Sequence, residues 1–191
     1  IIGVRSPPGS GKTMFLPELL REWGKRQAKR GREPLNKAVM IVFPTQFGCQ
    51  KIRDSLVDYR EHPYWNVTLR TGADKEDRFY VQDTYYQVVT YGMLWHWLVN
   101  GGEETQRFLF NQNCAFLLDE FSGKAAGGDP LELAADPQTM EIARLLAGFV
   151  RENSGTHRLL VTGASLDQHL MNAVLPGAEF LTFTGRMYPL E

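Results

Sequence analysis

The sequence predicts a three-layer α/β fold in which a mostly parallel sheet is flanked by helices. Apolar runs of strand length alternate with amphipathic stretches of helical length along the chain, which is typical of sheets built from βα units. A glycine-rich segment, Ser6–Thr13, joins the first apolar run to the first helical stretch. A later apolar run, Phe116–Leu118, ends in the two acids Asp119 and Glu120. In a parallel sheet both features fall at the edge where α/β proteins bind ligands.

The composition fits one globular domain without a general attraction for nucleic acid. The chain has 191 residues, a formal net charge of −1 and 43% hydrophobic residues, which is enough to bury a full core. No apolar run reaches membrane-spanning length, and no secretory leader appears. The two cysteines, Cys49 and Cys114, are far apart, so we expect a cytoplasmic or other reducing compartment. Because the chain begins at Ile1 inside an apolar run, we expect a piece of a longer protein.

Strands are expected where a short run of apolar and β-branched residues is bounded by turn residues. Pro44 ends the second of these runs, and a Thr-Gly pair at 71–72 ends the third. The expected strands, in chain order, are Ile1–Val4, Lys37–Phe43, Val67–Arg70, Gln87–Val89, Cys114–Leu118, Arg158–Thr162 and Phe180–Phe183.

Helices are expected where apolar residues recur every three or four positions. The first follows the glycine-rich segment and has an apolar face made of Met14, Leu16, Leu19, Leu20 and Trp23. The others are Gln46–Tyr59, a helix that holds Met93–Leu98, Thr139–Glu152 and Leu166–Val174. Asp74–Asp83 is expected to be a loop with a short strand, and the Gly- and Ala-rich Gly123–Asp136 a loop.

The segment Ser6–Thr13 reads Ser-Pro-Pro-Gly-Ser-Gly-Lys-Thr, the pattern of a phosphate-binding loop with Ser6 in place of the usual first glycine. Its backbone N–H groups would point into one cavity at the positive end of the following helix, which suits a nucleoside triphosphate. Lys12 would neutralise charge on the outer phosphates, and the Thr13 hydroxyl would ligate Mg²⁺. The residues expected to bind the nucleotide are Pro8, Gly9, Ser10, Gly11, Lys12 and Thr13.

The apolar run that ends in Asp119 and Glu120 supplies the second half of the predicted site. The carboxyl edge of a parallel sheet would place both carboxylates beside the phosphate loop. Asp119 would hold Mg²⁺, directly or through water, while Glu120 would orient and deprotonate the attacking water. Lys12 and Glu120 are therefore the expected catalytic residues, and the sequence predicts NTP hydrolysis.

Six sequence blocks follow one another in a familiar order. They are SPPGSGKT at 6–13, IVFPTQFGCQ at 41–50, VVTYGMLWHWL at 88–98, LLDEFS at 117–122, LLVTGASLD at 159–167 and TGRMYPLE at 184–191. Together they make the chain resemble, nearly end to end, the first RecA-like lobe of superfamily-2 helicases, specifically the DEAH-box and viral DEAH-like group.

This resemblance implies a RecA-like P-loop NTPase fold, with 1–184 as the first helicase lobe and 185–191 as the start of a linker to a second lobe. It implies ATP or another NTP with Mg²⁺ as cofactors. Single-stranded RNA, or DNA, would be the track, and the second lobe would supply arginine fingers. Alone, the lobe would then hydrolyse NTP slowly.

The resemblance also assigns residues to the track and to its coupling with hydrolysis. It places nucleic-acid contacts at Thr45, Gln46, Thr71, Gly72, Thr90 and Gly92. It places coupling positions at Ser122, Gly163, Ala164 and Ser165. Hydroxyls and backbone N–H groups at strand ends suit phosphate contacts, but each threonine could equally cap a helix or close a turn.

Two departures from the helicase pattern predict a divergent member, viral or cellular. Ser122 stands where relatives carry His or Asp, and a hydroxyl can form a hydrogen bond but carries no charge. Gln46 and Phe47 follow Thr45 where many relatives have an arginine, which removes one phosphate contact.

Other functions stay open on the sequence. A P-loop kinase of a small molecule or nucleotide would need an arginine-rich lid, and Gly123–Asp136 contains no arginine. Ser122 favours a degenerate, non-catalytic module, whereas intact Lys12, Thr13, Asp119 and Glu120 argue against it. The basic end of the first helix, 21–32, suits nucleic acid or is a solvated end that complements the helix dipole, and we favour the second interpretation.

Overall fold

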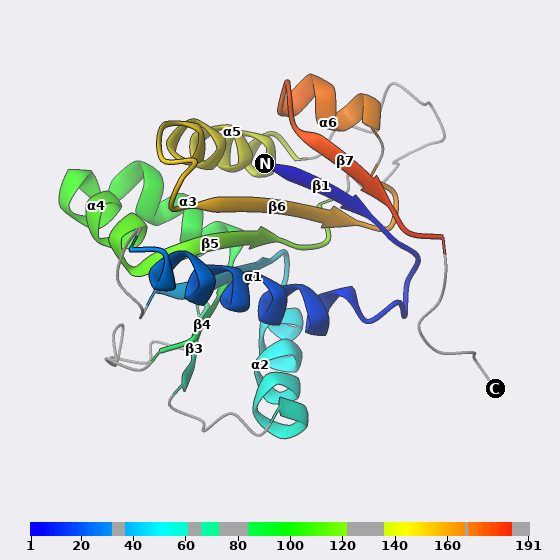
Figure 1. Ribbon diagram of the computed structural model, residues 1–191, viewed down its shortest axis with the longest axis horizontal. Helices are drawn as coiled ribbons and strands as arrows, with labels where there is room; N and C mark the ends of the chain where they lie inside the picture. Colours follow the sequence, from blue (N-terminus) through cyan, green and yellow to red (C-terminus); the bar gives the residue numbers. More distant parts are fainter. Residues whose placement is uncertain (32–36, 61–65, 73–83, 122–135, 167, 185–191) are drawn as a thin grey trace.

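Seven strands form one sheet at the centre of the molecule (Figure 1). The computed structural model describes residues 1–31, 37–60, 66–72, 84–121, 136–166 and 168–184. The strands are β1 (Ile2–Arg5), β2 (Ala38–Phe43), β3 (Val67–Arg70), β4 (Tyr86–Thr90), β5 (Asn113–Leu118), β6 (Arg158–Gly163) and β7 (Glu179–Thr182). Their order is β3-β4-β2-β5-β6-β1-β7, and every pairing among the described residues is parallel. The predicted α/β sheet is thus confirmed, and its described part is parallel throughout.

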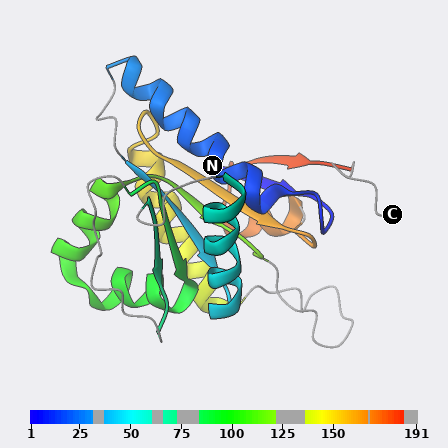
Figure 2. The same ribbon diagram turned by 90° about the horizontal axis from the view of Figure 1, so that it is seen from below.

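Helices lie on both faces of this sheet (Figure 2). They are α1 (Lys12–Lys29), α2 (Gln46–Arg60), α3 (Tyr91–Asn100), α4 (Gly102–Gln112), α5 (Pro137–Glu152) and α6 (Gln168–Val174). Alternate residues of β2 face opposite helix layers. Val39 and Ile41 pack in the core with α1 and α2, while Met40 and Val42 pack in the core with α3, α4, α5 and α6. A strand covered on both faces is apolar at every position, which is why β2 reads as a continuous apolar run.

Helix α4 was not predicted. Its apolar residues, Phe108, Leu109 and Phe110, are consecutive instead of spaced by three or four, and its buried member is Leu109. Two acids in its first turn, Glu103 and Glu104, complement the helix dipole. The helix therefore gives almost no periodic signal, although it packs against α3 and β5.

Element boundaries differ from the predicted ones by one or two residues, as expected when strand ends carry polar residues. The loops expected over 74–83 and 123–135 lie outside the described residues. Within the part of the chain that the structure describes, no helix is long and apolar enough to cross a membrane.

Cys49 and Cys114 are both free and buried. Burial raises the pKa of the Cys49 thiol to about 12 and that of the Cys114 thiol to about 11. A raised thiol pKa suppresses the thiolate, which is the reactive form.

We predict that neither cysteine reacts with a thiol reagent such as DTNB at pH 8 while the chain is folded. With these pKa values only about one thiol in a thousand or fewer is ionised at pH 8. The absorbance of the thiolate released from the reagent should not change until denaturant is added. It should then rise by the amount expected for the two cysteines of the chain. Rapid reaction of either thiol in the native chain would contradict this burial.

Candidate functional site

The phosphate-binding loop connects β1 to α1 and is shaped by two glycines. Gly9 and Gly11 have φ of 74° and 76°, in the left-handed region that favours glycine. The Ser10 hydroxyl donates to the Ser6 hydroxyl at 3.0 Å, and both side chains are buried. Ser6, which replaces the usual glycine, thus closes the loop through its side chain. Lys12 is the first residue of α1.

The carboxylate of Asp119 is the most heavily bonded group of the site. Asp119 is only 1% exposed, and its backbone N–H donates to the Val42 carbonyl at the end of β2. One carboxylate oxygen accepts from the Thr13 hydroxyl at 2.7 Å. The other accepts from the Thr162 hydroxyl and from the Glu120 backbone N–H. Helix α1, the end of β6 and the acidic turn are therefore joined at a single side chain.

Glu120 has an unusual backbone conformation for a residue with a side chain. Its φ is 54°, the one positive value outside glycine among the described residues, and such a conformation costs an L-residue about 1–2 kcal/mol. The residue is exposed, while the Tyr91 hydroxyl donates to the carbonyl of the preceding Asp119 at 3.0 Å. Strain of this kind persists when surrounding contacts enforce it, and it concentrates at functional sites.

The oxygens of Thr13 and Asp119 fit a magnesium ion. Adjacent ligands of an octahedral Mg²⁺ with bonds of 2.0–2.1 Å lie about 2.9 Å apart, close to the 2.7 Å between these two oxygens. No three His, Cys, Asp or Glu side chains gather into a metal site among the described residues. A cation here would therefore depend on one hydroxyl, one carboxylate, water and the phosphates of a ligand, which is the usual Mg²⁺ environment.

Gly163 packs directly on the turn that carries the acids. A Cβ atom at this position would lie 2.8 Å from the Phe121 carbonyl oxygen, a separation that the backbone cannot accept without moving. Glycine therefore lets the end of β6 approach the acidic turn. The other expected coupling positions are Ala164 and Ser165, which are exposed, and Ser122, which lies outside the described residues.

The residues expected to contact nucleic acid gather at the same sheet edge. Strands β3, β4 and β2 are neighbours, and the register pairs Phe43 with Thr90. A Cβ atom at Gly72 would lie 3.7 Å from the Gln46 amide nitrogen, so the side chain at the start of α2 reaches the turn that follows β3. The six positions brought to this edge are Thr45, Gln46, Thr71, Gly72, Thr90 and Gly92.

Two of these threonines cap helices. The Thr45 hydroxyl accepts the Gly48 backbone N–H at 3.0 Å, and the Thr90 hydroxyl accepts that of Met93 at 3.3 Å. Helix capping is the alternative to a phosphate contact that the sequence leaves open for each threonine. A hydroxyl that accepts one bond also has a proton to donate, so the caps do not exclude contact with a phosphate.

The basic end of α1 makes local contacts. Lys25 pairs with Glu22 at 2.5 Å, and the Arg21 guanidinium lies 3.7 Å from the centre of the Tyr85 ring. These contacts favour the solvated-end interpretation over a nucleic-acid patch.

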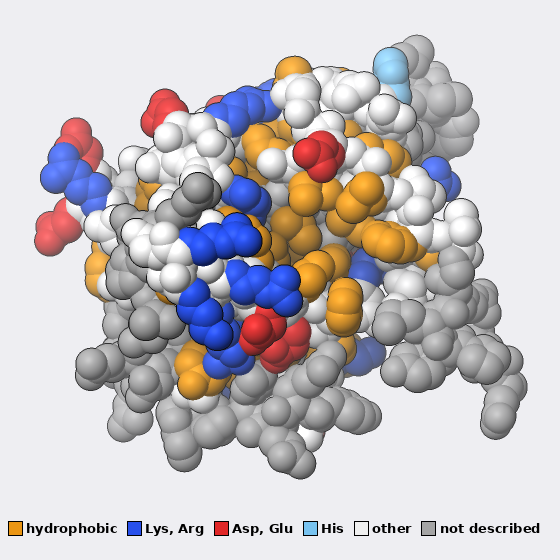
Figure 3. Space-filling view, in the orientation of Figure 1, with side chains coloured by type: hydrophobic (Ala, Val, Ile, Leu, Met, Phe, Trp, Pro, Cys, Tyr) orange, Lys and Arg blue, Asp and Glu red, His pale blue; other side chains and the backbone are white. Residues whose placement is uncertain are grey.

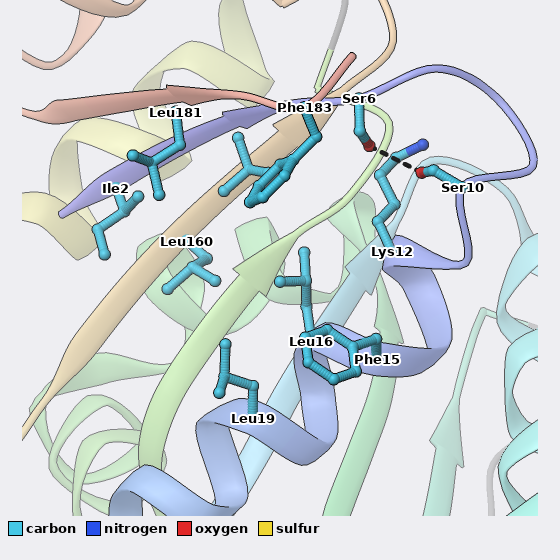
Figure 4. A pocket seen from close by; sticks show the side chains of 11 residues that line it. Ile2, Ser6, Ser10, Lys12, Phe15, Leu16, Leu19, Leu160, Leu181 and Phe183 are labelled. Atoms are coloured by element: carbon cyan, nitrogen blue, oxygen red, sulfur yellow. Dashed lines mark hydrogen bonds between the residues drawn. The ribbon is translucent and has the colours of Figure 1, made fainter. Parts of the chain in front are cut away.

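An apolar cavity of about 350 Å³ borders the phosphate loop, between α1 and the strands β1, β6 and β7 (Figure 4). Ser6, Ser10 and Lys12 lie at one end, and the other lining residues are apolar. On the same side of the molecule, apolar side chains gather between α1 and β7 (Figure 3). Apolar walls lower the local dielectric constant, which strengthens the attraction of a cation such as Lys12 for a phosphate.

Sequence reasoning missed three side chains of the site. Thr162 faces Asp119 because Leu118 pairs with Val161 in the neighbouring strands, and its sequence signal is its place at the end of an expected strand, within the block 159–167. The sequence pattern predicts Ser6 only as a small substitute for glycine, with no role for its hydroxyl. Nothing in the sequence indicates that the phenol of Tyr91 reaches Asp119.

We predict that Glu120→Gly raises the free energy of unfolding by about 0.5–1 kcal/mol. Glycine adopts positive φ without the steric cost that a Cβ atom imposes. The free energy gained in this way exceeds the free energy that glycine loses on folding because of its larger entropy in the unfolded chain. Urea denaturation measures the change. Glu152→Gly is the matched control, because this exposed glutamate lies in helix α5 and its replacement should lower stability. A loss of stability in both variants would show that Glu120 is not strained.

We predict that Gly163→Ala lowers the free energy of unfolding by about 1–3 kcal/mol, since the new methyl group would overpack the acidic turn. Gly148→Ala is the control: the space around Gly148 is open within 4 Å, and alanine in helix α5 should stabilise the chain by up to about 1 kcal/mol. Equal effects of the two substitutions would contradict the tight packing at Gly163.

Comparison with known proteins bears on the fold. No protein-family model and no curated protein matches this sequence. The structure is similar to that of the UvsW helicase from bacteriophage T4, with a TM-score of 0.58 and 18% sequence identity over 94% of this chain and 53% of that one. The chain therefore spans about half the length of that helicase. The likeness shows the fold alone, a three-layer RecA-like α/β fold.

Proposed function

We propose that this chain is the NTP-binding and NTP-hydrolysing lobe of an RNA helicase or translocase of the DEAH-like group. The observation that carries the proposal is the hydrogen bond between Thr13 of the phosphate loop and Asp119 of the acidic turn. It joins the two halves of a phosphoryl-transfer site that lie 106 positions apart in the sequence. The structural likeness to a helicase covers about half of that protein, which supports the proposal that this chain is one lobe of a motor.

In the proposed reaction the loop holds the phosphates and the acids act on metal and water. Backbone N–H groups of the loop and the Lys12 ammonium bind the phosphate oxygens. Thr13 and Asp119 would hold Mg²⁺, which would screen the charge of the outer phosphates. Glu120 orients a water molecule for in-line attack and accepts its proton.

The proposed track for single-stranded RNA runs over the ends of β3, β4 and β2. Exposed Thr45 and Gln46, and the exposed backbone at Gly72 and Gly92, offer a hydroxyl, an amide and N–H groups to phosphates. The two other expected contact residues, Thr71 and Thr90, are buried, with exposures of 1% and 8%. Such contacts do not read base sequence, as a translocase requires. In this proposal a second lobe follows and supplies the arginines that complete the nucleotide site.

We predict that Glu120→Gln lowers NTP turnover by about 10²–10⁴-fold, because the amide cannot accept the proton of the attacking water. Binding of a fluorescent nucleotide should stay within about twofold of wild type, whereas Lys12→Ala should weaken it strongly. Phosphate release without an added acceptor distinguishes hydrolysis from a kinase reaction.

Glu152→Gln provides the control, as its exposed glutamate lies on α5. The proposal also requires that the parent two-lobed protein turns over faster than this chain, since an arginine finger contributes about 10³–10⁵ in rate. It requires stimulation by single-stranded RNA. Equal turnover of both proteins that does not respond to RNA would contradict the helicase assignment.

A further inference from the structure

The peptide unit between Asp119 and Glu120 is held at both of its ends. Its N–H, from Glu120, donates to the Asp119 carboxylate at 2.8 Å. Its carbonyl, from Asp119, accepts the Tyr91 hydroxyl at 3.0 Å. Rotation of this unit changes ψ of Asp119 and φ of Glu120 together, so the two hydrogen bonds fix the backbone on which the Glu120 side chain is mounted.

The conformation fixed in this way is the strained one. Glu120 has a φ of 54°, and an unrestrained glutamate would return to negative φ. The bond to the Asp119 carboxylate is local to the turn, whereas the bond from Tyr91 comes from another element. Tyr91 is therefore the external contact that keeps this peptide unit from rotating.

Tyr91 is well placed for this task. It is the first residue of α3, next to the cap formed by Thr90, and it is 5% exposed in the core that also contains Leu118 and Phe121. Burial, with the nearby charges of Asp119 and Glu120, raises the pKa of the Tyr91 phenol well above its usual value. Since a carbonyl oxygen can only accept, the phenol is the donor in its bond to Asp119.

We propose that Tyr91 is a positioning residue for Glu120: its hydroxyl holds the Asp119 carbonyl and so keeps Glu120 in the left-handed conformation that presents its carboxylate at the nucleotide site. The catalytic part of this inference rests on the proposed function. Because Tyr91 lies between Thr90 and Gly92, the contact also connects Glu120 with the β4–α3 turn at the edge of the proposed track.

The first test compares the stability of four chains: wild type, Tyr91→Phe, Glu120→Gly and the double variant. If Tyr91 enforces the strain, the rise in melting temperature caused by Glu120→Gly should be smaller in the Tyr91→Phe background, where the peptide unit is already free to relax. A purely structural hydrogen bond would leave the two effects additive. Additivity would overturn the inference whether or not the chain is an enzyme.

The second test measures NTP turnover by Tyr91→Phe. We expect kcat to fall about fivefold to tenfold, the equivalent of one hydrogen bond. KM and the affinity for a fluorescent nucleotide should stay within about twofold, because the phosphate loop is untouched. Tyr86→Phe is the matched control. Tyr86 is fully buried and lies at the start of β4, paired with Val39 and Val67, which is the end of the strand opposite to Tyr91. The kcat of the Tyr86→Phe variant should therefore equal that of wild type.

The outcomes separate the two proposals. An unchanged kcat in Tyr91→Phe, together with loss of turnover in Glu120→Gln, would overturn the role of Tyr91 and leave the proposed function standing. A Glu120→Gln variant that turns over like wild type would overturn the proposed function, while the stability comparison would still decide whether Tyr91 holds the peptide unit.

Discussion

The buried carboxylate of Asp119 is the interaction on which the geometry of this site depends. A charge in such a place is stable only when hydrogen bonds replace its lost hydration. Thr13, Thr162 and the Glu120 N–H supply those bonds, and they come from α1, β6 and the acidic turn. The need to satisfy one carboxylate thus fixes the phosphate loop relative to the acids.

The strand order places the acidic turn between the phosphate loop and the expected nucleic-acid contacts. Strand β5, which carries the acids, lies between β6 and β2. Beyond β6 comes β1 with the phosphate loop, and beyond β2 come β4 and β3 with the expected nucleic-acid contacts. Neighbouring strands are only about 4.8 Å apart, so a small displacement of the end of β5 changes its contacts with both β6 and β2. Gly163 and Tyr91 make two of the close contacts between the acidic turn and the elements around it.

Much of this was predictable from residue types. The parallel sheet follows from buried runs such as β2, and the phosphate loop from its glycines and Lys12, because these patterns are local. The pairing of Thr13 with Asp119 followed from the rule that parallel strands end at one edge. Helix α4 was missed because its three apolar residues are consecutive. The bond from Tyr91 to Asp119 could not be predicted, since it depends on how far a side chain reaches across two strands.

The hydrogen bond between Thr13 and Asp119 also has a consequence for how the molecule opens locally. Thr13 lies in the first turn of α1, and Asp119 is anchored to β2 and β6. The first turn of α1 cannot leave the sheet without withdrawing a donor from a buried carboxylate, which costs free energy. Local opening of the phosphate loop therefore has to involve the acidic turn, although 106 positions separate the two residues. Two segments that are remote in the sequence thus form one cooperative unit.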